Sequence, residues 1–384
     1  MATAVDTSNM TNPSFVLQSL HHVQIEDRPI PALRSPTHDV LLHIAQTGIC
    51  GSDIHYWQRG RIGSFVLDSP IVLGHESSGT VVRAGSGVSP HHLRPGDRVA
   101  VEPGEPCRRC AHCRAGEYNL CAATIFAATP PHDGTLQKFF AVAADYCYRV
   151  PAHVDMEEAA LVEPVAVAVQ VCKTAGVPLG GRSVLVFGCG PIGVLCQAVA
   201  RAYGASVVCG VDVDESRLEL ARAFAGSETV MNPSVGDEGG EGGAREPVER
   251  AEVAAGLLKE RLGLGEGADV VLECTGAEPC IQAGVFAARS GGVYVQAGMG
   301  KENVTFPITT ACIRGLTIKG SIRYTAGCYP AAIDLVASGK VPVKKLVTHR
   351  FKFEEAEKAF ELVKAAKEGV FKVVIAGVDQ PLLG

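Results

Sequence analysis

Hydrophobic positions follow two different rhythms along the 384-residue chain. Residues 14–150 carry short apolar runs, partly alternating with polar residues as in 39–48, and Gly and Pro bound these runs. Such runs are typical of short β-strands joined by turns. From residue 183 onward, apolar strands alternate with longer stretches of helical periodicity. Because that alternation is typical of a parallel sheet with helices on both faces, we expect an α/β domain to follow a β-rich one.

The alternating part predicts a series of elements. Strands are expected at 183–187, 206–213, 268–276 and 292–300, and helices at 191–204, 215–226 and 277–292. Asp214 precedes the second of these helices, where its carboxylate can accept hydrogen bonds from the free backbone N–H groups. The stretch 234–249 is rich in Gly and Glu and has no apolar period. We interpret it as an exposed loop that leads into a helix.

The rhythm relaxes after about residue 305. The expected elements there are a segment at 315–324, helices at 329–339 and 354–369, and a closing strand at 371–377. We therefore expect the tail to return to the N-terminal domain. The resulting division is a β-rich domain at 1–166, a doubly wound domain at 167–304 and a returning segment at 305–384.

Composition and charge exclude several classes of protein. A chain of 384 residues is long for one hydrophobic core, so two domains are expected. Its 47% hydrophobic and 20% charged residues suit a folded globule. A net charge of -6 disfavours nucleic acid as a partner. Residues 1–15 lack the basic and apolar regions of a secretory signal, so the 14 cysteines are expected to be reduced thiols and metal ligands in the cytosol.

An uncharged run at 183–200 is long enough to raise the question of a membrane span. Gly188, Gly190, Pro191 and Gly193 interrupt its centre. We therefore interpret the run as a strand, a tight turn and a helix, and we expect no membrane partner.

The three glycines of this turn form the pattern G-x-G-x-x-G inside a βαβ unit. Glycines let the backbone approach a pyrophosphate, which the helix N-terminus attracts. Asp212 ends the next strand, 24 positions after Gly188, where its carboxylate suits the ribose hydroxyls of an adenosine. Val213 and Asp214 follow it in place of an Arg for a 2′-phosphate, which favours NAD over NADP, and Arg217 can cover the adenine. The alternative is a packing turn in a nucleotide-free domain.

Four cysteines lie close together with the spacing C-x2-C-x2-C-x7-C. They are Cys107, Cys110, Cys113 and Cys121. Zinc binds such sets tetrahedrally, and four thiolates leave no open position for water or substrate. The spacing therefore predicts a structural zinc. A chance cluster of unpaired thiols and a redox-sensitive loop are the alternatives.

A second group of possible ligands is scattered over three segments. These segments offer Cys50, Ser52, His55 and Tyr56 (47–57), His75 and Glu76 (74–79), and Glu163 (161–169). A single His or buried Glu usually has a purely structural explanation. Together, however, these residues supply the Cys, His and carboxylate set of a catalytic zinc that keeps one position open.

Taken in order, the motifs resemble those of the zinc-dependent medium-chain dehydrogenases, from about residue 15 to 376. The motifs are GICGSDIHYW, GHESSGTV, the four-cysteine loop, EPVAVAV, GCGPIG and VTHRF. Glu163 stands where alcohol dehydrogenases have a third thiolate ligand, as in sorbitol and xylitol dehydrogenases. The segments EPGEPCRRCAHC and FAATPPHDGTL are most similar to fungal xylitol dehydrogenases (D-xylulose reductases). The four cysteines depart from the animal sorbitol dehydrogenases, which have lost that loop's zinc.

The resemblance implies an α/β fold with a GroES-like catalytic domain and a Rossmann NAD-binding domain. It implies reversible hydride transfer between a polyol, xylitol, and NAD, assisted by one catalytic zinc, with one structural zinc besides. Cys50, His75 and Glu76 would be the catalytic ligands, and Glu163 would lie beside the metal. Which glutamate binds at rest stays open. Ser52 and His55 match the family's proton relay through the nicotinamide ribose.

Further site residues are implied in the same way. The substrate would contact Tyr56, Phe126, Glu163, Arg323 and Tyr324, and NAD would contact Pro191 and Ile192 in the glycine turn and Ala297, Gly298 and Met299 along the nicotinamide. Arg323 can equally be a surface ion-pair partner. Asp53 is expected to brace the metal ligands.

Two rival functions stay open. A sorbitol or L-arabinitol dehydrogenase would use the same zinc chemistry, because a pocket discriminates weakly against one hydroxymethyl unit. The non-catalytic alternative is a reductase-fold protein kept only for zinc binding. The complete ligand set argues against it. Relatives are commonly tetramers, so a homo-oligomer, tetramer or dimer, is expected.

Overall fold

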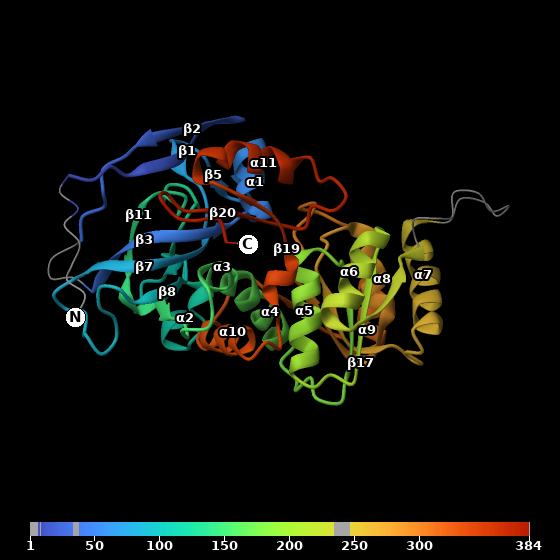
Figure 1. Cartoon of the computed structure of the whole chain (residues 1–384). Coiled ribbons are helices and arrows are strands. Elements are labelled where there is room, and N and C mark those ends of the chain that lie inside the picture. Colours follow the sequence, from blue (N-terminus) through green and yellow to red (C-terminus); the bar gives the residue numbers. More distant parts are fainter. Residues whose placement is uncertain (1–6, 8, 34–37, 234–245, 384) are drawn as a thin grey trace. The chain divides into compact units, whose positions relative to one another are not determined.

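A computed structural model describes residues 7, 9–33, 38–233 and 246–383 (Figure 1). The chain forms two compact units. The first comprises 1–163, 325–337 and 343–384, and the second comprises 164–324 and 338–342. Residues 234–245 of the predicted Gly- and Glu-rich loop lie outside the described residues.

The first unit is built on a seven-stranded sheet with the order β12-β8-β7-β3-β20-β19 and with β11 beside β3. Its strands are β12 (Cys147–Arg149), β8 (Arg98–Val101), β7 (Glu76–Ala84), β3 (Asp39–Gly48), β20 (Lys372–Ala376), β19 (Val347–Phe351) and β11 (Phe139–Ala143). β3 pairs along one edge with β7, and along the other with β11 and then β20 (Figure 1). The C-terminal strand β20 therefore extends a sheet that N-terminal strands begin.

Shorter elements complete this unit. The strands are β1 (Pro13–Ser19), β2 (His22–Asp27), β4 (Arg61–Ile62), β5 (Phe65–Val66), β6 (Ile71–Val72), β9 (Gly104–Glu105) and β10 (Ile125–Phe126). The helices are α1 (Gly51–Arg59), α2 (Ala111–Arg114), α3 (Met156–Ala160), α10 (Cys328–Ala337) and α11 (Ala356–Lys364), with 3-10 turns η1 (Tyr118–Leu120), η2 (Ala144–Tyr146), η4 (Val343–Leu346) and η5 (Phe353–Glu355).

Helix α1 follows directly from its sequence. Cys50 is its N-cap residue, and the Asp53 carboxylate accepts a hydrogen bond from the Cys50 backbone N–H at 3.1 Å. Gly60 ends the helix in the left-handed conformation, with φ 66°, which glycine adopts without steric cost. Trp57 on α1 packs its ring 6.0 Å from that of Phe360 on α11. The helix thus buries one face, with Ile54, Tyr56 and Trp57, and begins shortly after β3 at Cys50, a predicted metal ligand.

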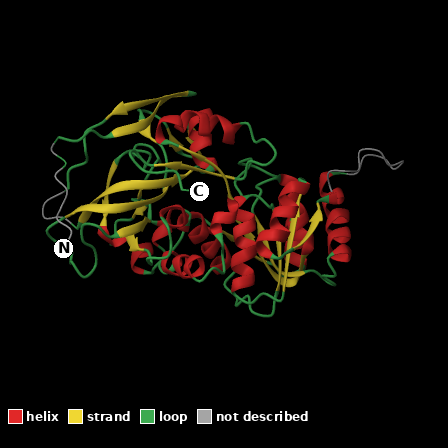
Figure 2. Ribbon diagram, in the orientation of Figure 1, coloured by secondary structure: helices red, strands yellow, loops and turns green. Residues whose placement is uncertain are grey.

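The second unit contains a six-stranded sheet in which every pair of neighbours is parallel. Figure 2 shows its strands in yellow with helices in red beside them. Its order is β15-β14-β13-β16-β17-β18. The strands are β13 (Ser183–Phe187), β14 (Val207–Asp212), β15 (Glu228–Met231), β16 (Ala268–Glu273), β17 (Ala288–Gln296) and β18 (Thr317–Gly320). This 3-2-1-4-5-6 order is that of the Rossmann fold, which binds ligands where the order reverses, between β13 and β16. The predicted doubly wound α/β fold is confirmed.

Helices alternate with these strands as the sequence predicts. They are α4 (Val162–Thr174, which begins in the first unit), α5 (Pro191–Ala202), α6 (Glu215–Ala225), α7 (Pro247–Arg261), α8 (Glu278–Ala287) and α9 (Ile308–Ile313). Asp214 caps α6 as predicted, because its carboxylate accepts hydrogen bonds from the N–H groups of Ser216 and Arg217. α8 is shorter than its expected range, since the chain becomes extended at Ala288 and pairs with Ala268.

One other expectation changes at the end of an element, whereas the run 183–200 divides as predicted. The expected helix 354–369 ends as α11 at Lys364, because Ala366 adopts a positive φ of 44°. The apolar run 183–200 divides into β13 and α5 around the glycine turn. Among the described residues, no helix has both the length and the apolar character needed to cross a bilayer.

Candidate zinc and nucleotide sites

The four-cysteine loop brings its thiols together. The ligand atoms of Cys107, Cys110, Cys113 and Cys121 all lie within 4.8 Å of one another. Backbone N–H groups point at two of the sulfur atoms, from Cys110 to Cys107 at 3.3 Å and from Cys107 to Cys121 at 3.4 Å. These hydrogen bonds stabilise negative charge on sulfur, and the pKa of Cys121 falls to about 6.

The same loop contains a thiol that resists ionisation. Burial, together with the neighbouring thiols, raises the pKa of Cys113 to about 12. Four thiolates this close repel one another unless a cation lies among them. A tetrahedral zinc satisfies that requirement, and four sulfur ligands would leave it no open position. The loop therefore fits a structural zinc.

The scattered ligands also come together, apart from one. The ligand atoms of Cys50, His75 and Glu76 lie within 4.8 Å of one another. Cys50 follows β3, and Glu76 begins β7 opposite Gly48 in the β3–β7 ladder. Glu163, in the first turn of α4, is buried but does not belong to this group. Of the two candidate glutamates, the geometry favours Glu76 as the resting ligand.

Asp53 orients the histidine of this set. Its Oδ1 lies 3.5 Å from His75 Nδ1 and accepts a hydrogen bond from the Gly74 N–H at 3.0 Å. Burial lowers the pKa of His75, but the Asp53 carboxylate outweighs it and holds that pKa well above the usual value. Nδ1 faces the Asp53 carboxylate, and Nε2 lies 3.4 Å from Ser52 Oγ. Carboxylates behind metal-binding histidines act in this way.

Glu76, the third candidate ligand, belongs to a buried ion pair. Lys372 Nζ pairs with Glu76 Oε2 and donates a hydrogen bond to the carbonyl of Ile49 at 3.0 Å. Burial opposes the charge on Lys372, but the carboxylate of Glu76 outweighs it and raises the lysine pKa. The sequence analysis missed Lys372. Its signal is a lysine inside the apolar strand KVVIA.

The predicted relay and substrate residues divide into two kinds of environment. Ser52 and His55 are partly exposed, and Ser52 Oγ lies 3.4 Å from His75 Nε2. Burial, followed by the charge of Arg59, lowers the pKa of His55. Tyr56 is 3% exposed and belongs to the core cluster around Trp57. The ring of Phe126, another predicted substrate contact, lies 5.8 Å from that of His75.

The glycine turn has the geometry of a pyrophosphate site. Gly188 has a φ of 95°, and a Cβ there would approach the Thr275 methyl group to 2.8 Å. A Cβ on Gly193 would overlap the Gly188 carbonyl, so both positions require glycine. Gly190 caps α5, whose first residue is Pro191, which is followed by Ile192. The positive end of α5 therefore points into the turn.

Asp212 lies beside this turn at the end of β14. Its Oδ2 accepts a hydrogen bond from the Cys189 N–H at 2.7 Å, and its Oδ1 accepts one from the Val213 N–H at 2.7 Å. Arg217 lies 3.9 Å from the Asp214 carboxylate. The carboxylate of Asp212 is thus fixed within the second unit, next to the predicted pyrophosphate site.

The carboxyl ends of β16 and β17 hold the residues predicted to lie along the nicotinamide. The N–H groups of Ala297 and Gly298 donate to the Glu273 carbonyl at 2.9 and 2.8 Å. Met299, which follows them, is exposed. The buried Glu273 carboxylate, which the sequence analysis missed, accepts hydrogen bonds from the Thr275 N–H and from Gln296. An acid that ends an apolar strand was its signal.

Arg323 and Tyr324 belong to the second unit. Arg323 has a positive φ of 51°, which is uncommon for a residue other than glycine. Tyr324 is buried. Their contact with substrate stays a prediction.

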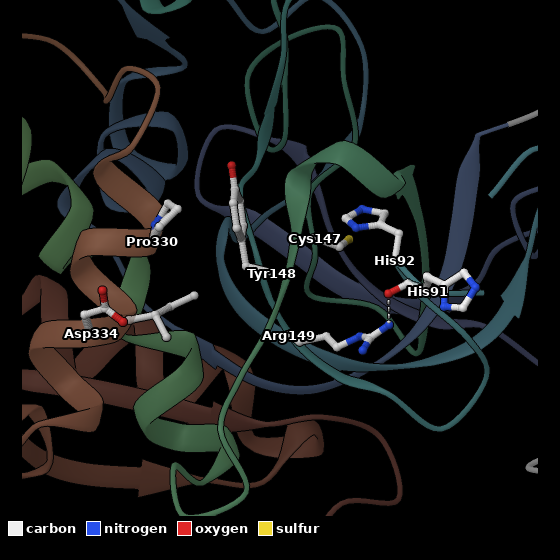
Figure 3. Close-up of a pocket in the computed structure, with 8 residues that line it drawn as sticks. His91, His92, Cys147, Tyr148, Arg149, Pro330 and Asp334 are labelled. Atoms are coloured by element: carbon white, nitrogen blue, oxygen red, sulfur yellow. Dashed lines mark hydrogen bonds between the residues drawn. The ribbon is translucent and has the colours of Figure 1, made fainter. Parts of the chain in front are cut away.

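A pocket of about 390 Å³ in the first unit is lined by residues that are not among the predicted site residues (Figure 3). It is lined by His91, His92, Cys147, Tyr148, Arg149, Pro330, Ile333 and Asp334. Arg149 donates a hydrogen bond to the His91 carbonyl at 2.8 Å and pairs with Asp97 at 3.0 Å. The charge of Arg149 is therefore compensated by Asp97.

Comparison with known proteins identifies the family. Residues 36–152 match the alcohol dehydrogenase GroES-like domain, and residues 191–338 match the zinc-binding dehydrogenase domain. The chain belongs to the zinc-dependent medium-chain dehydrogenases. This membership confirms the resemblance and the prediction that the protein is an enzyme.

Individual relatives agree with this assignment. The dehydrogenase is 51% identical over 376 residues to "Probable D-xylulose reductase A" of Aspergillus clavatus, covering 98% of this chain and 99% of that one. It is 49% identical over 378 residues to D-xylulose reductase A of Aspergillus niger, with 98% and 99% covered. An alcohol dehydrogenase of Escherichia coli CFT073, crystallised with NADH, has a TM-score of 0.81 at 25% identity, covering 95% of this chain and 99% of that one.

Proposed function

We propose that the dehydrogenase is an NAD-dependent xylitol dehydrogenase, or D-xylulose reductase. It transfers a hydride reversibly between a secondary alcohol of xylitol and C4 of the nicotinamide. The observation that carries the proposal is the mixed ligand set of Cys50, His75 and Glu76, which lies within 4.8 Å on a chain 51% identical to a D-xylulose reductase.

The residues of this set suit a catalytic metal. Zinc, when bound by Cys50, His75 and Glu76, supplies a Lewis acid that lowers the pKa of the substrate hydroxyl. Three protein ligands leave a fourth position for that hydroxyl. Asp53 keeps the proton on Nδ1 of His75, so the ring presents Nε2 to the metal. The Phe126 ring beside His75 reduces the access of water to this position.

We assign the alcohol's proton to a relay along α1. Ser52 and His55 are three residues apart in this helix, so they share one face. Ser52 Oγ lies next to His75, and the lowered pKa of His55 keeps its imidazole neutral and able to accept a proton near pH 7. Glu163 is proposed to lie near the metal and the substrate. Support comes from its charge, which acts on the buried Lys372.

In this proposal, the second unit binds the cofactor. We assign the pyrophosphate of NAD to the turn from Gly188 to Gly193 at the N-terminus of α5, and the adenosine ribose hydroxyls to Asp212. A fixed carboxylate beside Val213 repels a 2′-phosphate, which supports NAD over NADP. Ala297, Gly298 and Met299 would face the nicotinamide.

We further propose contacts from Tyr56, Phe126, Arg323 and Tyr324 to the polyol. A homo-oligomer is also proposed. Its support is the outer edge of β18, the last strand in its sheet, together with exposed Ile308 and Ile313 nearby. The cytosol is proposed as the compartment because all 14 cysteines are free thiols.

Steady-state kinetics test the proposed function. The values of kcat/KM for xylitol, sorbitol and L-arabinitol are measured with NAD and with NADP, and the zinc content of the same preparation is counted. We expect xylitol with NAD to give the highest value, with about two zinc ions per chain from the two ligand groups. A higher value for sorbitol or L-arabinitol would replace xylitol as the substrate, and absence of dehydrogenase activity would refute the proposal.

A further inference from the structure

Lys372 is a cation buried among the ligands of the mixed metal site. Its side chain is 6% exposed, and its partner Glu76 is 2% exposed. The ammonium group contacts Glu76 Oε2 and the Ile49 carbonyl. Removing one member of a buried ion pair leaves the other charge buried without compensation, which destabilises the folded state. A chain that only needed to fill this space would use an apolar residue in the apolar strand β20.

A glycine in strand β3, Gly48, leaves space for the ion pair. Gly48 lies opposite Glu76 in the β3–β7 ladder and opposite Val374 in the β3–β20 ladder. A Cβ on Gly48 would overlap Glu76 Oε2 and would come within 3.1 Å of Lys372 Cε. The φ of Gly48 lies outside the left-handed region, so the backbone does not demand glycine there. Glycine is required at position 48 because the two charged side chains fill the space that a Cβ would take.

Lys372 offsets part of the negative charge around the site. Cys50 as a thiolate, Asp53, Glu76 and Glu163 would carry four negative charges. A divalent zinc and one ammonium would carry three positive charges, so the site would be more strongly negative without the lysine. Because unbalanced charge is costly in a buried site, the lysine belongs to the electrostatics of the metal centre.

We propose that Lys372 is a positioning residue that holds one carboxylate oxygen of Glu76 and leaves the other oxygen to the zinc. Glu76 then binds through one oxygen and keeps the fourth coordination position open for substrate, and Gly48 provides the room. The inference rests on the proposed function, because it requires a metal at Cys50, His75 and Glu76.

The test uses the full-length enzyme with 113Cd in place of zinc. NMR of the wild type is expected to show separate resonances for the four-thiolate and mixed sites, which differ in ligand type. Lys372→Met is expected to shift the mixed-site resonance and leave the other in place. It should lower kcat on xylitol in the zinc enzyme about ten- to hundredfold, since small displacements of catalytic groups have effects of this size. Lys372→Arg, which keeps the charge, is expected to retain most of the wild-type signal and rate.

Lys138→Met is the matched control. It removes a lysine whose carboxylate partner, Asp379, lies 2.7 Å away near the surface, and both resonances should stay unchanged. Gly48→Ala keeps every charge and should shift the mixed-site resonance in the same direction as Lys372→Met. If Lys372→Met does not fold, Gly48→Ala and Lys372→Arg carry the test.

Two results would overturn the inference and are distinguishable. An unchanged mixed-site resonance in the variants that fold, Gly48→Ala included, would show that Lys372 does not position Glu76 while leaving the proposed function intact. A wild-type spectrum with the four-thiolate resonance alone would refute the mixed metal site, and the proposed function and this inference would fail together.

Discussion

His75 shows how single residues divide the work at the mixed metal site. Its Nδ1 faces Asp53 at 3.5 Å, and its Nε2 lies 3.4 Å from Ser52 Oγ. One ring therefore connects a buried carboxylate, the metal position and the first residue of the proposed relay. The sequence places Asp53 next to Ser52 and His75 next to Glu76, so short motifs supply both sides of this arrangement.

At the same scale, substitution of Asp212 tests the assigned preference for NAD over NADP. Asp212→Ala combined with Val213→Arg removes the hydrogen bonds to the ribose and adds a cation for a 2′-phosphate. A hydrogen bond to a charged group is worth about 1.5–3 kcal/mol, so kcat/KM for NAD should fall about tenfold or more while that for NADP rises.

Val213→Arg alone serves as the control for that variant. It keeps the Asp212 hydrogen bond to the Cys189 N–H, which helps to fix the glycine turn, and it should change preference less. An unchanged ratio of the two kcat/KM values in the double variant would remove Asp212 from its assigned role.

Glu102 is a buried carboxyl group whose ionisation should appear in the stability of the protein. It accepts hydrogen bonds from the hydroxyls of Tyr118 at 2.6 Å and Tyr148 at 2.8 Å. Burial raises its pKa to about 7, although both tyrosines act in the opposite direction. The folded state thus binds this proton more tightly than the unfolded state, whose pKa is 4.5. Its contribution is present below the unfolded value and is lost as pH rises towards 7.

In the wild type, the free energy of unfolding is expected to fall by ~3 kcal/mol at most between pH 4.5 and 7. This fall should be absent in Glu102→Gln. The measurement is urea-induced unfolding of both proteins across this range. Both proteins keep the same zinc ligands and are compared in the same zinc-containing buffers. Parallel pH profiles would contradict the raised pKa.

At the scale of elements, the four-cysteine loop is proposed to be held together by its own metal. α2 and η1 are one helical turn each, too short to be stable without further support. Cys110→Ser should therefore lower the melting temperature and the zinc content by about one ion per chain before it affects chemistry. Thermal unfolding with metal analysis checks this. A variant that keeps both zinc ions and its heat stability would show that the loop needs no metal.

The same scale explains what the sequence could predict. The Rossmann strands, the glycine turn and the Asp214 cap follow from local periodicity and from residues a few positions apart. Lys372 does not, because it meets Ile49 across 323 positions through the pairing of β3 with β20. Apolar runs predict that such strands exist but carry no information about which strands pair. Glu76 could be named as a ligand, whereas its buried partner and the space that Gly48 provides required the structure.

At the scale of the whole molecule, the chemistry is divided between two units of one chain. The metal ligands lie in the first unit and the nucleotide residues in the second. The chain passes from the first unit to the second and back, so the C-terminal β20 delivers Lys372 to the sheet that carries Glu76. In the proposed division, the most conspicuous motif, the four-cysteine loop, is structural, and the reaction belongs to ligands separated in sequence.

The most direct test of this division compares Cys50→Ser with Cys110→Ser by zinc content and xylitol oxidation with NAD. Loss of one of three catalytic ligands should leave Cys50→Ser folded with about one zinc ion per chain and a rate at least about a thousandfold below the wild type. Cys110→Ser should lose the other zinc and keep substantial activity at low temperature. Oxidation of xylitol by Cys50→Ser at the wild-type rate would contradict the assignment of the catalytic zinc.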